Sequence, residues 1–322
     1  AGAFALLFFG KLFDIAALAE VAASPVAVLI GMTAIALIAL GLLMSTIHLG
    51  KPMRFYRGFN NLRHSPVSRE GLGIVLFMAF AGLHFLAALP ANAWVQQWFG
   101  VLPASLAGVA ATVADVTAGL AVLSSAAALY YMYRCYRIKA RPFWDHKQTA
   151  FAFAGNVLAL GSLVVGVFAV PYLLLNGMSA TALLSLLGSL MAAGMLLEGI
   201  GLILHAQDLR GAEHEGAASF YIQLTTFGKT YIARNVMLAV NALAALLLVN
   251  LGDTGALALA GWAVLLLTTT AVALVGRALF YVVVVPTTMP GAFFWKNKAF
   301  EQHARDIGLA DMPQVGVAPL KH

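Results

Sequence analysis

Long runs of apolar residues, broken by short polar connections, extend along most of the chain. Eight such runs cover residues 1–19, 26–47, 70–89, 102–133, 149–175, 179–205, 232–251 and 255–285. Each is long enough to cross about 30 Å of hydrocarbon as a helix that rises about 1.5 Å per residue. Alternating polar and apolar positions, typical of strands, are missing, and Ala, Leu and Gly prevail. The pattern predicts an all-α, polytopic integral membrane protein whose eight transmembrane helices form a bundle.

The polar connections fall into two sets that differ in charge. Residues 20–25, 90–101, 176–178 and 252–254 carry no Lys or Arg, and we refer to the end of the bundle that they form as side A. The other connections and the C-terminal stretch form side B and carry all but one of the 19 Lys and Arg residues. The exception, Lys11, lies inside the first run. Because basic loops stay in the cytoplasm, side B and both termini are predicted to be cytoplasmic.

Composition supports the membrane assignment and narrows the chemistry. The chain is 61% hydrophobic and 10% charged, with a mean hydropathy of +0.88. A soluble domain carries about a quarter charged residues, so too little polar surface is present here to cover a water-soluble globule. The single cysteine, Cys135, excludes an internal disulfide framework and any all-cysteine zinc or iron–sulfur site within this chain.

Several ionisable residues lie inside the predicted spans, where a charge is costly and often marks a functional site. They are Lys11, Asp14, His84, Asp115, Glu198, His205 and Arg277. Lys11 and Asp14 are three residues apart on one helical face, so mutual neutralisation is favoured over a proton relay. For His84, near side A, a hydrogen bond to a neighbouring backbone is the favoured interpretation.

The other candidates near side B keep two interpretations each. Glu198 and His205 share one helical face, and they form either part of a functional site or a hydrogen bond between helices. Arg277 either extends its head group to the membrane interface or points at an anionic or carbonyl-bearing ligand.

The connection between the second and third spans is the densest polar region. His48 closes one helix and Glu70 opens the next, so both side chains belong at the same depth on side B. Ser68 is a plausible N-cap, with Glu70 in the first turn, where the helix dipole favours an anion. The functional alternative is a proton-handling pair, because His titrates near neutral pH and burial raises a carboxyl pKa toward it. Proton and electron chemistry at this depth suggests a quinone.

At these residues the sequence resembles a known family, the membrane-anchor subunits of dimethyl-sulfoxide-reductase-type molybdopterin oxidoreductases. The matching segments are HLG-x-P at 48–52, NLR-x-S at 61–65, S-R-E at 68–70, Arg141-Pro142-Phe143-Trp144, and Tyr231 with Arg234-Asn235. Eight spans is also the family's number. Pro66-Val67 stands where the family commonly has Trp-Leu before the S-R-E segment.

The resemblance implies a division of labour between subunits. The protein would form a single membrane-anchor domain over residues 1–322, in the inner membrane of a bacterium or archaeon. It would bind quinone or quinol as an exchangeable ligand and carry no metal or covalent cofactor. Its partners would be an iron–sulfur subunit and a molybdopterin catalytic subunit that performs the substrate chemistry. No nucleic-acid partner is expected.

The resemblance also assigns residues. The family's quinol-site histidine and glutamate map onto His48 and Glu70, and the wider quinone-binding or proton-handling set is predicted to be His48, Arg69, Glu70, Arg234 and Arg277. Basic loops suit an acidic partner. The predicted docking residues are Lys51, Arg54, Arg57, Arg63, Arg137, Arg141 and Trp144.

Two other functions are compatible with a polytopic helical protein. A cytochrome b-type haem anchor needs paired axial histidines at one depth, which His48 and His205 could supply near side B. A secondary transporter typically shows inverted repeats and helices broken by Gly or Pro at mid-membrane. Here Gly and Pro lie mostly near span ends and no paired halves are recognisable, which favours the anchor subunit.

Overall fold

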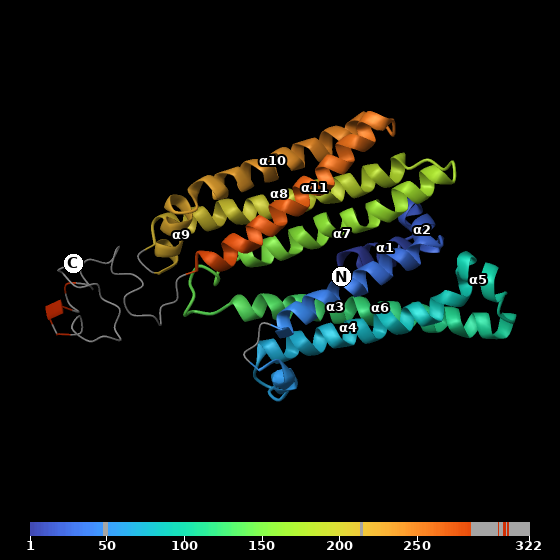
Figure 1. Cartoon of the computed structure of the whole chain (residues 1–322), viewed down its shortest axis with the longest axis horizontal. Helices are drawn as coiled ribbons and strands as arrows, with labels where there is room; N and C mark the ends of the chain where they lie inside the picture. Colours follow the sequence, from blue (N-terminus) through green and yellow to red (C-terminus); the bar gives the residue numbers. More distant parts are fainter. Residues whose placement is uncertain (48–50, 213–214, 285–301, 303–304, 307, 309–322) are drawn as a thin grey trace.

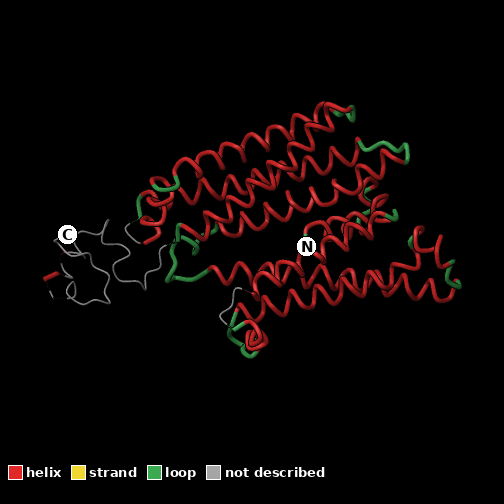
Figure 2. The backbone as a smooth tube through the Cα atoms, viewed as in Figure 1, coloured by secondary structure: helices red, strands yellow, loops and turns green. Residues whose placement is uncertain are grey.

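The structure is a computed structural model that describes residues 1–47, 51–212, 215–284, 302, 305–306 and 308. Within these residues it is entirely helical and contains no strand. The long helices run side by side along one axis, joined by short loops at the two ends (Figures 1 and 2). The prediction of an all-α polytopic membrane protein is confirmed.

Seven helices are long and apolar enough to cross a membrane. Six consist of a single helix: α3 (Val26–Ile47), α6 (Ala104–Tyr136), α7 (Gln148–Leu175), α8 (Thr181–Arg210), α10 (Gly228–Leu251) and α11 (Ala256–Val282). The seventh joins α4 (Pro66–Ala88) to the short 3-10 helix η2 (Leu89–Ala91). Shorter helices lie in the connections: η1 (Pro52–Phe59), α5 (Ala93–Phe99) and α9 (Glu215–Thr225). Seven of the predicted runs therefore correspond to helices of membrane-spanning length.

The first predicted run, 1–19, is not one straight helix. It is divided into α1 (Gly2–Leu12) and α2 (Ala16–Ala23), which are bent by 108° relative to each other. Asp14 takes a left-handed conformation with φ 51°, and the Ile15 amide donates to the Gly10 carbonyl over 2.9 Å. This geometry closes a helix C-terminus, usually around a glycine. The number of spans is thus seven, or eight if this bent pair counts as one.

The bend also changes the partner of Lys11. Its ammonium pairs with the carboxylate of Asp115 on α6, and the predicted neutralisation by Asp14 is wrong. Both side chains remain more than half exposed on the protein, 63% for Lys11 and 57% for Asp115. The pair therefore lies on the outer surface of the bundle, where each charge compensates the other.

The helices pack in two groups with α1 between them. In one group α4 packs along α6, and Phe4 of α1 joins Phe77 and Ala121 in their common core. In the other, α7 packs along α8 while α10 and α11 cover them. Gly2 of α1 meets α7 so closely that a Cβ added at Gly161 would lie 2.8 Å from the Gly2 backbone. Small residues let these backbones approach, as in other membrane helix pairs.

The α7–α8 contact gives a prediction about stability. A Cβ added at Gly194 would lie 2.5 Å from the Gly155 carbonyl oxygen, whereas one added at Gly199 on the same helix meets nothing within 4 Å. We expect Gly194→Ala to destabilise the protein by about 1–3 kcal/mol through overpacking. Gly199→Ala should be neutral or mildly stabilising because Ala favours a helix. Thermal unfolding in detergent measures both, and equal midpoints for the two variants would refute the close packing.

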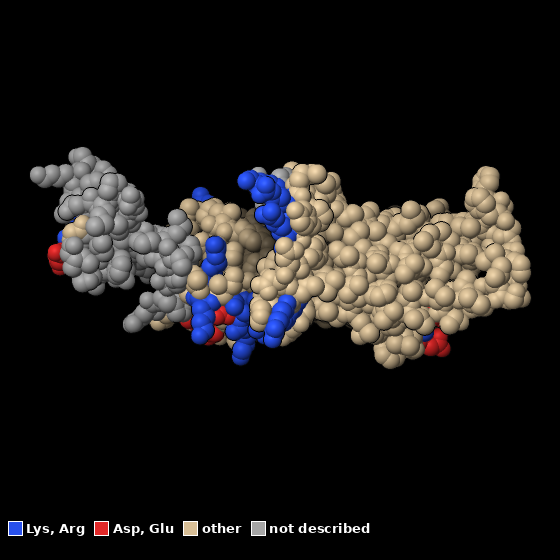
Figure 3. All heavy atoms as spheres, turned by 90° about the horizontal axis from the view of Figure 1, so that it is seen from below, with Lys and Arg blue, Asp and Glu red and all other residues tan. Residues whose placement is uncertain are grey.

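Basic residues gather at one end of the long axis, as Figure 3 shows for the face it displays. The connections at this end are the α3–α4 segment, the loop 137–147 and the α8–α10 segment. They match the predicted side B, and the ends of α6, α8 and α11 meet there (Figure 1). The one-sided charge of the sequence thus becomes one basic end of the bundle.

Candidate functional site at the basic end of the bundle

Glu70 lies on α4 near the basic end, one turn deeper in the helix than the sequence suggested. Ser65 is the N-cap and accepts a hydrogen bond from the Ser68 amide over 3.3 Å, with Pro66 at the first helical position. Proline suits that position because its fixed φ is helical and it has no amide hydrogen to satisfy. The predicted cap at Ser68 and first-turn place of Glu70 are therefore wrong.

Glu70 reaches across to α6 and faces α11. The Cys135 thiol donates a hydrogen bond to Glu70 Oε2 over 3.2 Å. Arg277 on α11 is close enough to Glu70 for a Coulombic interaction. Both Glu70 and Arg277 are half-buried. Two residues predicted as part of one site, but distant in sequence, are thus brought together.

Aromatic rings surround the Arg277 guanidinium. Its central carbon lies 4.6 Å from the centre of the Phe153 ring and 5.5 Å from that of Phe280. The hydroxyl of Tyr281, whose ring is also near, hydrogen-bonds the hydroxyl of Tyr136. Cation–π attraction of this kind holds a cation without a carboxylate. Arg277 therefore faces aromatic rings, and we refer to Glu70, Cys135, Tyr136, Arg277 and Tyr281 as the Glu70–Arg277 cluster.

Trp144 braces this cluster from the loop before α7. Its indole stacks on Phe280 with ring centres 5.4 Å apart, and Nε1 donates to the Phe280 carbonyl over 2.7 Å. Arg141 lies over the other part of the same side chain, 4.7 Å from the ring centre. Trp144, predicted as a docking residue, is thus half-buried and packed against α11.

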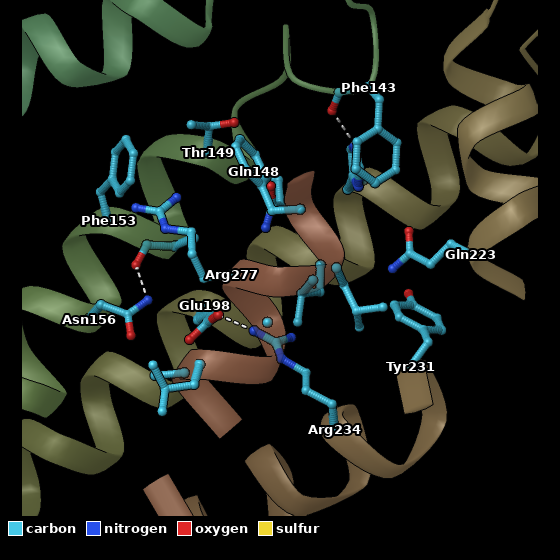
Figure 4. A pocket seen from close by; sticks show the side chains of 18 of the residues that line it. Phe143, Gln148, Thr149, Phe153, Asn156, Glu198, Gln223, Tyr231, Arg234 and Arg277 are labelled. Atoms are coloured by element: carbon cyan, nitrogen blue, oxygen red, sulfur yellow. Dashed lines mark hydrogen bonds and ion pairs between the residues drawn. The ribbon is translucent and has the colours of Figure 1, made fainter. Parts of the chain in front are cut away.

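A cavity of about 280 Å³ opens next to the cluster, between α7, α8, α10 and α11 (Figure 4). Arg277 and Phe153 line it as well, so the cavity and the cluster share a wall. In its interior Arg234 of α10 donates to the carboxylate of Glu198 on α8. The two side chains are only 5% and 7% exposed, respectively. A charge pair this deeply buried is costly to desolvate and must be well matched.

The partners of Glu198 and His205 decide between their two interpretations. Glu198 makes the interhelical bond to Arg234, and His205 is bonded through Nε2 to the carbonyl oxygen of Phe143 over 2.9 Å. A haem anchor would need a free His205 ring nitrogen for the iron, and Nε2 is already engaged. His84 near side A bonds the Ala114 carbonyl through Nδ1 over 2.8 Å, which confirms the predicted backbone hydrogen bond.

The remaining predicted site residues are separated. Arg69 donates from Nε to the Leu62 carbonyl over 2.8 Å and also to the Arg63 carbonyl, so it shapes the loop before α4. Arg234 lies in the cavity with Arg277 rather than beside Glu70. The predicted partner of Glu70, His48, falls outside the residues that the structure describes.

Exposed basic residues cover the surface beside the site. In the α3–α4 connection these are Lys51, Arg54, Arg57 and Arg63. In the loop before α7, Arg137 is also exposed but pairs with Asp145. The α3–α4 connection is thus the most open basic surface of this end.

Sequence reasoning missed the residues that complete the cluster. Tyr136, Phe153, Phe280 and Tyr281 carry no signal in a single sequence, because aromatic residues are common near membrane interfaces. Only Cys135 had one: it is the single cysteine of the protein.

An apolar helical bundle with one basic end and an ionisable cluster at that end defines a multi-pass membrane subunit. The family described as DMSO reductase anchor subunit (DmsC) matches residues 1–283, and the chain belongs to that family. The resemblance found in the sequence is therefore confirmed.

A curated relative points to the same kind of complex. It is one subunit of the anaerobic dimethyl sulfoxide reductase of Haemophilus influenzae, and it is 30% identical over 131 residues. These residues make up 41% of this protein and 41% of the relative, so the match spans about two fifths of that relative's length. No solved structure matches this protein.

Proposed function

We propose that this protein is the quinone-binding anchor subunit of a molybdopterin oxidoreductase complex in the inner membrane of a bacterium or archaeon. It holds an iron–sulfur subunit and a molybdopterin catalytic subunit at the membrane and passes electrons between the quinone pool and the iron–sulfur subunit. Family membership supports the anchor role. The observation that carries the quinone role is the Glu70–Arg277 cluster, where a carboxylate and a guanidinium face each other at the end of the bundle.

The cluster has the groups that quinone chemistry needs. Oxidation of a quinol releases two electrons, which go to the iron–sulfur subunit, and two protons. Glu70 is suited to accept a proton as general base. Arg277 would stabilise negative charge that develops on a quinone oxygen, and the rings of Phe153 and Phe280 offer flat faces to a planar head group. His48 is the proposed second proton acceptor, on the basis of its family motif. In the opposite direction the same groups donate protons to the reduced quinone.

The basic surface of the α3–α4 connection is the proposed dock for the iron–sulfur subunit. Lys51, Arg54, Arg57 and Arg63 are exposed there, next to the cluster. A partner bound on this surface places its nearest cluster close to the quinone, and the charge favours an acidic partner.

Co-purification tests both the complex and the dock. Purification in mild detergent from the source cells should bring an iron–sulfur subunit and a large molybdenum-containing subunit with this protein. Arg54→Glu with Arg57→Glu should release both subunits at a salt concentration that leaves the unchanged complex intact, because charge reversal replaces attraction by repulsion. Glu20→Lys on α2, exposed at side A, is the matched control. Recovery of the protein without partners contradicts the proposed complex, and equal salt resistance contradicts the dock.

The positive-inside rule places the basic end in the cytoplasm. Lys139 is exposed in the loop before α7, and Lys139→Cys provides a marker for this end. With Cys135→Ser as background, an impermeant thiol reagent should label the marker in inverted vesicles and not in intact cells. The opposite pattern would place the basic end outside.

A further inference from the structure

The cavity behind Arg277 reaches far into the bundle from the basic end. Its lining on α7 runs from Gln148, at the first residue of the helix, to Leu160. At about 1.5 Å per residue this stretch measures about 18 Å, roughly half the thickness of a bilayer core. The cavity is thus a deep, one-ended pocket, with polar side chains at its mouth and along its walls.

Two buried polar atoms in this lining have no hydrogen-bond partner within the described part of the protein. They are Nε of Arg234 and Oε1 of Gln223, on residues that are 6% and 5% exposed. Figure 4 shows Arg234 at the centre of the lining and Gln223 beside Tyr231. A buried donor or acceptor without a partner costs about 1–3 kcal/mol. Water removes that cost where a cavity is polar and roomy, and one molecule takes about 30 Å³.

A line of polar groups connects the cavity with the surface of the basic end. Asp208, at the end of α8, is 67% exposed and bonds Nε2 of His146 over 2.8 Å. The His146 ring lies 4.9 Å from that of His205, centre to centre. His205 is buried and lines the cavity. Exposed and buried titratable groups therefore follow one another from the surface to the cavity.

The inner wall of the cavity is the cluster itself. Arg277 lines the cavity and also faces Glu70. Glu198 offsets the charge of Arg234, so Arg277 is the one guanidinium of the lining, among the described residues, that lacks a carboxylate in hydrogen-bond contact.

We propose that this cavity is a water-filled proton path between the surface of the basic end and the Glu70–Arg277 cluster. The proposal rests on the proposed function and adds a route for its protons. A quinol that gives two electrons to the iron–sulfur subunit loses two protons to the cluster. These pass to water in the cavity and leave by His205, His146 and Asp208. Reduction of a quinone uses the same path inward.

Cysteine accessibility tests the water directly and needs no quinone. Ala273 lines the cavity, whereas Ala271 on the same helix is exposed on the outer surface and faces lipid. In a Cys135→Ser background, in membranes that contain the whole complex, we expect methanethiosulfonate ethylammonium to modify Ala273→Cys at least tenfold faster than Ala271→Cys. The reagent attacks thiolates, which form only in contact with water. Equal rates overturn the water path. Protection of Ala273→Cys by decylubiquinone also overturns it, because the cavity then holds a quinone head group.

Closing the cavity tests the path in turnover. Ala273→Leu fills the lining with apolar atoms, and Ala271→Leu is the matched control on the lipid face. Quinol-driven turnover should fall about tenfold in Ala273→Leu, with a larger solvent deuterium isotope effect, and stay unchanged in Ala271→Leu. Activity of the complex with an artificial electron donor should be normal in both. Normal turnover in Ala273→Leu together with low turnover in Glu70→Gln overturns the path and leaves the quinone site standing. Normal turnover in Glu70→Gln instead contradicts the quinone site itself.

Discussion

Replacing Glu70 by Gln is expected to reduce quinol-driven turnover of the complex by at least about 100-fold, the usual contribution of a positioned general base. Gln keeps the shape of the side chain and can still accept the Cys135 thiol hydrogen, but it cannot take a proton from quinol. Glu70→Asp keeps the carboxylate and should retain more activity than Glu70→Gln. The measurement is turnover in isolated membranes with a reduced short-chain quinone as donor.

Two comparisons separate chemistry from assembly. Activity with an artificial dye that feeds the catalytic subunits directly should be unchanged in Glu70→Gln, because the substituted residue lies in the anchor. Glu20→Gln, an exposed carboxylate on α2 at the opposite end, should behave like the unchanged protein in both assays. Conservative replacement of His48 should give the same pattern as Glu70→Gln. Normal quinol turnover in Glu70→Gln, or an equal loss with both donors, would rule out its assigned role.

The helices of membrane-spanning length were predictable because each is a long apolar run between charged connections. The bend between α1 and α2 was not predictable in this way. Chain reversals of this kind are usually marked by glycine in the left-handed conformation, whereas here Asp14 takes that conformation within an apolar run. The same bend moved Lys11 away from Asp14 and toward Asp115 of α6. Local spacing suggested one ion pair, and tertiary packing chose another.

The candidate site was predictable only in part. Glu70 and Arg277 stood out because an ionisable residue near a span end is costly. Their proximity depends on how α4 and α11 are arranged, which one sequence does not give. The hydrogen bond from Cys135 and the rings around Arg277 depend on the same arrangement. Ser68 matched the N-cap pattern, but Ser65 followed by Pro66 starts α4 one turn earlier.

The buried pair of Glu198 and Arg234 should have the largest effect on stability. Replacing one partner, by Glu198→Leu or Arg234→Met, leaves the other charge buried without compensation. Breaking a buried pair in this way typically costs about 3–5 kcal/mol. Each single variant should therefore accumulate poorly in membranes and unfold at a clearly lower temperature in detergent. Arg210→Met, exposed at the end of α8, is a control that should change neither measure.

The double variant Glu198→Leu with Arg234→Met separates the two roles of this pair. Replacing both charges by apolar groups of similar volume is often neutral or stabilising, so the double variant should regain most of the stability that each single variant loses. It also makes the centre of the cavity apolar and removes the unpartnered Arg234 Nε, so water loses its polar partners there. Quinol-driven turnover should therefore stay low although the protein is folded and holds its partners. A double variant as unstable as either single one would show that the pair is not mutually compensating, and one that is both stable and fully active would show that its charges serve neither purpose.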